Sequence, residues 1–196
     1  MGTDTEQLRR HFLDRSLPSL LEGLFAFATK HKGEWFSGHL ELSDFDGVDV
    51  AEELWGHVAG AAQTYGDDLR RLALFAQDGD GSKYALWFHA DQPSEGAPVV
   101  YINSEGEDSL LTDTLADFLT LLRLDRDDVG MFATVPRDPD SEHAEAHEAY
   151  LEWADEHGVP AAPTDVEALL RSARAKHPDF AAWYLTLKEK IWALEQ

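Results

Sequence analysis

Apolar side chains recur every three or four residues through residues 4–32, which is the spacing of one face of an α-helix. These positions are Leu8, Phe12, Leu20, Leu21, Leu24 and Phe25. Pro18 divides the stripe where a proline fits the first turn of a second helix, because its missing N–H is not needed there. The segment is therefore predicted to form two helices. A short strand at residues 39–42 and a helix at residues 51–66 are predicted to follow.

Between residues 72 and 103 the pattern changes to three short runs of apolar, aromatic and β-branched side chains, which are typical of β-strands. The three apolar runs are "LALFAQ" (72–77), "SKYALWFHA" (82–90) and "APVVYIN" (97–103). Short stretches rich in Asp, Gly, Pro and Ser separate them, which predicts an antiparallel meander. In the middle run, Tyr84 and Leu86 alternate with Trp87 and His89. The face that carries Trp87 is either covered by a helix or presents its aromatic side chains to a partner.

Helical spacing returns after the meander. In "SLLTDTLADFLTLLRL", Leu115, Phe118, Leu119 and Leu122 form an amphipathic stripe, and Thr112-Asp113 can cap its start. This helix is predicted to cover the sheet. The predicted class is therefore α+β, with an antiparallel or mixed sheet flanked by helices.

Three regions are predicted along the chain. Residues 1–124 form the α+β core, residues 125–140 form an acidic linker that contains prolines, and residues 141–196 form a helical extension packed on the core. The last helix carries an apolar stripe that must pack on something. The stripe consists of Phe180, Trp183, Tyr184, Leu187, Ile191 and Leu194.

Acidic residues dominate the composition. The 196 residues include 38 Asp and Glu against 16 Lys and Arg, which gives a formal net charge of −22. This charge disfavours direct nucleic-acid binding, and it serves either solubility or attraction to a basic partner. The chain has no cysteine, and no apolar run approaches the about 18 residues that a membrane span needs. A soluble cytoplasmic protein without disulfides or a membrane segment is expected.

The turn Asp78-Gly79-Asp80-Gly81 resembles the start of a calcium-binding loop. An EF-hand loop counted from Asp78 needs glycine at its sixth position and glutamate at its twelfth, but Lys83 and His89 stand there. Asp and Gly both favour tight hairpins. The stretch is therefore predicted to be a turn between strands, without a metal.

Candidate catalytic chemistry is sparse. His143 and His147 are four residues apart, a spacing that can chelate zinc, but Ala144 stands where a metalloprotease helix has glutamate. The chain has no nucleophile elbow, P-loop or dinucleotide-binding glycine motif. We therefore predict no enzyme activity and no cofactor, with a metal-dependent enzyme built on the two histidines as the alternative.

The block from Leu74 to Leu122 resembles the SUKH superfamily, which includes yeast cell-wall assembly regulators and bacterial immunity proteins. The matching features are Phe75-Ala76, Asp78-Gly79-x-Gly81, Tyr84-x-Leu86, Val99-Val100, Glu105-Gly106 and Leu115-x-x-Phe118-Leu119. The resemblance implies an α+β domain that binds a partner and catalyses no reaction. It also implies that an immunity protein would occlude a toxin, often a nuclease with a basic groove, and the acidic charge of this chain suits that role.

The resulting hypothesis is a non-enzymatic protein that binds another protein, such as a basic toxin. One end of its binding face is predicted to consist of Asp78, Asp80, Trp87, His89, Glu105, Glu107 and Asp108. Besides the metal enzyme, the alternative is a structural or regulatory module that forms a homodimer through the C-terminal aromatic stripe.

Overall fold

The structure, a computed structural model, describes residues 5–12, 15–31, 35–38, 40–89, 92–106, 108–126 and 143–196. Glu107 and nearly all of the predicted linker 125–140 lie outside the described residues. The predicted division into core, linker and extension therefore stays a prediction.

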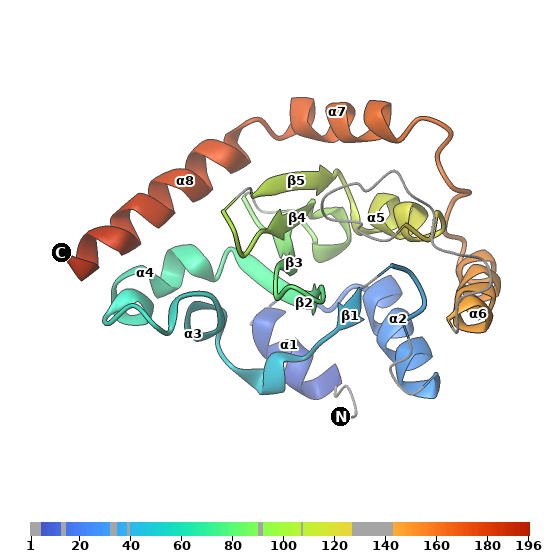
Figure 1. The fold of residues 1–196 in the computed structure, drawn as a ribbon, viewed down its shortest axis with the longest axis horizontal. Helices are drawn as coiled ribbons and strands as arrows, with labels where there is room; N and C mark the ends of the chain where they lie inside the picture. Colours follow the sequence, from blue (N-terminus) through green and yellow to red (C-terminus); the bar gives the residue numbers. More distant parts are fainter. Residues whose placement is uncertain are drawn as a thin grey trace.

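Five antiparallel strands form one sheet, and their order in space follows their order in the chain (Figure 1). The strands are β1 (Glu41–Leu42), β2 (Leu72–Gln77), β3 (Lys83–Trp87), β4 (Val99–Ile102) and β5 (Ser109–Thr112). The helices around them are α1 (Thr5–Phe12), α2 (Ser19–Lys30), α3 (Val50–Trp55), α4 (Ala61–Leu69), α5 (Leu115–Leu122), α6 (Ala144–Glu156), α7 (Val166–Lys176) and α8 (Asp179–Trp192). The α+β class and the helical C-terminus are confirmed.

The meander is confirmed, but it has a strand that the sequence did not predict. β2, β3 and β4 lie within the three apolar runs, and β5 then pairs with β4 through Ser109–Thr112, which lead into the predicted helix. The helix α5 begins only at Leu115. Its N-cap is Thr114, whose hydroxyl oxygen accepts a hydrogen bond from the Asp117 amide at 3.1 Å. The predicted cap at Thr112-Asp113 was therefore wrong, because Thr112 is the last residue of β5.

The predicted helix at 51–66 is two helices. α3 ends at Trp55, and α4 begins after Gly60, which has a φ of +83°. Glycine reaches this left-handed conformation without the steric cost that a Cβ imposes. The change of direction brings α4 near α8.

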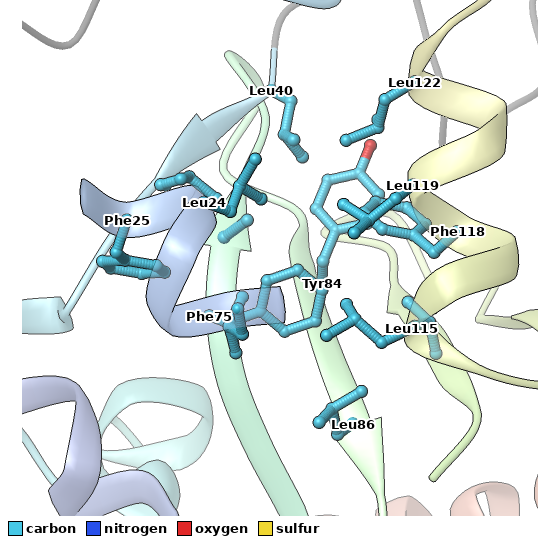
Figure 2. Packing of buried hydrophobic residues seen from close by; sticks show 14 of the residues in the cluster. Leu24, Phe25, Leu40, Phe75, Tyr84, Leu86, Leu115, Phe118, Leu119 and Leu122 are labelled. Carbon is cyan, nitrogen blue, oxygen red and sulfur yellow. The ribbon is translucent and has the colours of Figure 1, made fainter. Parts of the chain in front are cut away.

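One face of the sheet packs against α1, α2, α5 and α6. Phe75 and Tyr84 lie between the side chains of α2 and α5 (Figure 2). The centroid of the Phe118 ring lies 5.8 Å from that of Phe75 and 5.5 Å from that of Tyr84. Tyr150 of α6 joins the same cluster and donates a hydrogen bond to the Leu119 carbonyl at 2.7 Å. The prediction that the helix at residues 115–122 covers the meander is confirmed.

The other face packs against α3, α4 and α8. Leu74, Ala85 and Trp87 from the sheet form a second buried cluster with Phe180 and Tyr184 of α8. A helix therefore covers this face, which decides between the two interpretations left open by the alternation in β3. The C-terminal stripe packs largely on the chain's own sheet: Phe180, Tyr184, Leu187 and Ile191 are buried, Trp183 is partly buried, and Leu194 is exposed. Most of the stripe is therefore not available to a second copy of the chain, and the homodimer itself stays a prediction.

The helix α7 lies along β5, the last strand of the sheet (Figure 1). Arg174 of α7 donates a hydrogen bond from Nε to the Leu110 carbonyl at 3.3 Å. Beyond β5, Lys176 forms an ion pair with Asp113, and His177 Nε2 lies 2.6 Å from the second oxygen of the same carboxylate. Burial raises the pKa of Asp113, but the bonds from Lys176 and His177 outweigh burial and lower it overall.

Candidate functional site

The structure does not bring the seven predicted site residues together. Asp78 and Asp80 lie in the β2–β3 turn, and Glu105 and Asp108 lie in the β4–β5 turn. These turns share one end of the sheet, because Lys83 at the start of β3 pairs with Ile102 at the end of β4. We call this the sheet end. The prediction of a common location holds for these four residues only, and Glu107 lies outside the described residues.

Trp87 was wrongly assigned to the binding face. It is 1% exposed, and its indole packs against Phe180 and Trp183 of α8 with ring centroids 5.1 Å and 5.5 Å away. Trp87 thus belongs to the core between the sheet and α8. His89 is exposed but follows the far end of β3, where its ring lies 5.0 Å from that of His177. Both residues are therefore separated from the sheet end by the length of β3.

Asp78 organises the hairpin turn. One of its carboxylate oxygens accepts hydrogen bonds from the amides of Asp80 at 3.1 Å and Ser82 at 2.9 Å, and the other accepts one from the Tyr101 hydroxyl at 2.6 Å. Its backbone N–H donates to the Ser82 carbonyl. The predicted turn between antiparallel strands is confirmed. The Asp78 side chain has an internal structural role, so it is not available to a partner in the way that the exposed Asp80 is.

The two glycines of this turn provide a matched test of its conformation. Gly81 has a φ of +84°, whereas Gly79 has no positive φ, and a Cβ at either position would meet no atom within 4 Å. Gly81→Ala is expected to lower the free energy of unfolding by about 1 kcal/mol because of backbone strain alone, and Gly79→Ala to leave it unchanged or raise it slightly. Urea denaturation measures both. Equal effects of the two substitutions would contradict the described turn.

A cavity of about 420 Å³ opens at the sheet end. Its walls come from α3, the loop after it, the two turns, the ends of β3 and β4, and α8. The side chains that matter for its chemistry are Glu53, Trp55, His57, Lys83, Glu105, Asp108, Tyr184, Lys188 and Trp192. The cavity is within the size range of small-ligand sites, and it combines aromatic walls with converging polar groups. We call it the sheet-end pocket.

Two ion pairs are built into the sheet-end pocket. Lys188 of α8 pairs with Asp108, and the two side chains are only 10% and 9% exposed. The Lys188 ammonium also donates to the Gly106 carbonyl at 3.3 Å. Lys83 pairs with Glu53 of α3 at 2.8 Å. Charged contacts thus link α3 to β3, and α8 to the β4–β5 turn, on the lining of the pocket.

Burial shifts two pKa values in the pocket. It raises the pKa of Asp108, while the bond and charge of Lys188 act in the opposite direction. Burial also raises the pKa of Tyr184, and the nearby charge of Asp108 raises it further, so the phenol stays protonated at neutral pH. Shifted pKa values in a cavity are typical of functional sites, although structural ion pairs produce them too.

The aromatic wall consists of Trp55, Tyr184 and Trp192. Trp55 is buried, and its ring packs edge-on against that of Trp192 at 6.0 Å between centroids. Trp192 is 45% exposed at the end of α8. Tryptophan is one of the residues that most often dominate the binding energy of protein interfaces. The sequence did not predict this wall, because Trp55 lies on α3 and the other two residues lie on α8. One signal was present: Trp192 lies outside the apolar stripe of its helix, which indicates an exposed tryptophan.

The two histidines with zinc spacing have other contacts. His147 Nδ1 lies 2.7 Å from the Phe36 carbonyl oxygen, and Asp125 Oδ1 lies 3.9 Å from the same nitrogen. The His143 ring packs on Trp35 with centroids 5.5 Å apart. Among the residues that the structure describes, no group of three or more His, Cys, Asp or Glu side chains is arranged to hold a metal ion. Within the described part of the chain, His143 and His147 therefore lack the third ligand that the alternative, a metal-dependent enzyme, would need.

Comparison with known proteins yields no relative: no protein-family model, curated protein or solved structure matches this chain. None of the helices formed by the described residues has the length and apolar character needed to cross a bilayer.

Proposed function

We propose that this chain is a non-enzymatic binding protein and that its partner is a basic protein that docks at the sheet end. The observation that carries the proposal is that the exposed side chains of Trp192 and Glu105 line one pocket, with the exposed carboxylate of Asp80 in the turn beside it. Neither Asp80 nor Glu105 forms an ion pair with any described residue. Aromatic anchors surrounded by polar groups are the usual energetic centres of protein interfaces.

The charge of the whole chain supports a basic partner. A formal net charge of −22 attracts a positively charged surface over a long range and accelerates association. The resemblance of residues 74–122 to the SUKH superfamily makes a toxin with a basic substrate groove the first partner to test. In that case, the carboxylates at the sheet end would occupy positions that the phosphates of the toxin's substrate otherwise take.

The test uses the product of a toxin-like gene adjacent to the gene for this protein. It measures the affinity of this chain for that product and the inhibition of that product at one-to-one stoichiometry. We expect the dissociation constant to rise at least about tenfold between about 50 mM and 0.5 M salt, because screening removes the electrostatic attraction. An affinity that does not respond to salt would contradict the proposal.

A charge-matched pair of double variants tests where the partner docks. Asp80→Asn with Glu105→Gln is expected to slow association several-fold, because it removes the unpaired charges at the sheet end. Glu156→Gln with Glu167→Gln removes the same number of charges from exposed positions on α6 and α7. If both double variants slow association equally, attraction is diffuse and the sheet end is not the docking site.

A further inference from the structure

The sheet-end pocket has one carboxylate without a counter-charge. Three carboxylates line it: Glu53 is paired with Lys83 and Asp108 with Lys188, whereas Glu105 has no ion pair with any described residue. The formal charge of these five side chains is therefore −1, since three negative charges meet two positive ones. The pocket consequently favours a cation over an anion.

The aromatic wall favours a flat cation. A guanidinium group stacks on an indole and forms two parallel hydrogen bonds to a carboxylate, whereas an ammonium group acts as a point charge. Trp192 and Glu105 provide these two partners on the lining of one pocket. We propose that the sheet-end pocket binds the guanidinium group of an arginine side chain supplied by the basic partner. This inference rests on the proposed function and gives the chemistry of its central contact.

The pocket is prepared for this ligand before the partner arrives. The edge-on contact with buried Trp55 restrains the Trp192 ring, so less conformational entropy is lost on binding. Lys188 is the nearest competing cation, with its ammonium 5.8 Å from the Trp192 ring centre. Its charge is compensated by Asp108 and it donates to the Gly106 carbonyl, so it opposes an incoming guanidinium only weakly.

The experiment follows the tryptophan indole N–H signals by NMR while N-acetyl-arginine amide is added to the full-length protein. The neutral isostere N-acetyl-citrulline amide and the ammonium analogue N-acetyl-lysine amide are added in parallel. We expect the arginine compound to shift the Trp192 signal in a saturable manner, and both analogues to bind at least about tenfold more weakly. Equal binding of the citrulline or the lysine compound would overturn the assignment.

Two variants locate the site. Glu105→Gln is expected to weaken binding of the arginine compound about tenfold, because the charge-assisted hydrogen bonds are lost. Trp192→Leu is expected to weaken it to a similar extent, because the stacking surface is removed. Glu156→Gln, at an exposed position on α6, is the control and should leave binding unchanged. An unaltered affinity in Glu105→Gln, with the fold intact by circular dichroism, would also overturn the assignment.

The pocket and the proposed function can fail separately. If the arginine compound binds at Trp192 but no basic protein is bound, the proposed function fails and the pocket assignment stands. If a basic protein binds in a salt-dependent way with the same affinity for Glu105→Gln, Trp192→Leu and the unaltered chain, the pocket assignment fails and the proposed function stands.

Discussion

Replacement of Lys188 by methionine is expected to lower the free energy of unfolding by about 3–5 kcal/mol at neutral pH. The side chains of Lys188 and Asp108 are only 10% and 9% exposed, so the substitution leaves a buried carboxylate without its counter-charge. Methionine has nearly the same length as lysine and fills most of the same buried volume without a charge. The loss is therefore due to the missing charge rather than to a cavity.

The loss in Lys188→Met is expected to shrink as the pH falls. Burial raises the pKa of Asp108 above its value in the unfolded chain even with Lys188 present, and removal of the ammonium raises it further. Between the two pKa values the folded state binds more protons than the unfolded state, so its stability increases on acidification through this group. Urea denaturation at several pH values, compared with the unaltered chain, measures this difference.

Removal of the other charge, by Asp108→Asn, is expected to lower the free energy of unfolding by less than Lys188→Met does. In Asp108→Asn the amide oxygen can still accept from Lys188 or from the Asn103 amide, which now donates to Asp108 at 3.1 Å. The double variant Asp108→Asn with Lys188→Met should be more stable than Lys188→Met alone, because it no longer buries an uncompensated charge. If the losses of the single variants simply add, the buried pair does not couple α8 to the β4–β5 turn.

Phe180→Ala is the second substitution with a large expected effect. Phe180 is 1% exposed and packs against both Trp87 and Tyr184, so its truncation removes buried apolar contacts and leaves a cavity between α8 and the sheet. The expected loss in the free energy of unfolding is about 3–5 kcal/mol. Thermal and urea unfolding measure it, and the near-ultraviolet circular dichroism of Trp87 should weaken at the same time.

A control lies on the same helix. Leu185 of α8 is 52% exposed, and Leu185→Ala is expected to change the free energy of unfolding by no more than about 0.5 kcal/mol. The comparison separates loss of packing from loss of helix-forming tendency, because both variants introduce alanine into α8. Similar small effects of the two substitutions would show that α8 does not cover the sheet.

The elements that the sequence predicted well are those whose pattern depends on local contacts. The strands β2 and β3 follow from short apolar and aromatic runs separated by an Asp-Gly turn, and α5 follows from Phe118 and its neighbours at helical spacing. β5 could not be separated from α5, because Leu110 and Leu111 continue the apolar run that leads into the helix. Only pairing with β4, a contact with another segment, makes Ser109–Thr112 a strand.

The candidate site was predicted in part. The common location of the two acidic turns follows from the meander. Successive turns of an antiparallel meander lie at opposite ends of the sheet, so the β2–β3 and β4–β5 turns share one end. Trp87 was misplaced because alternation shows which side chains share a face but not whether that face is covered. Lys188 and Trp192 were missed because α8 reaches the sheet end only through tertiary packing, about eighty residues after the β4–β5 turn, as the separation of 80 between Asp108 and Lys188 shows.

The position of α7 along β5 has a consequence for self-aggregation. The outer strand of an open sheet exposes backbone groups to which a strand from another molecule can add. Arg174 of α7 donates a hydrogen bond to the Leu110 carbonyl of the edge strand β5. The opposite edge strand is β1, which is only two residues long. Growth of the sheet by intermolecular strand addition is therefore hindered at both borders. For a chain with 11% aromatic residues, this arrangement disfavours edge-to-edge association of folded molecules.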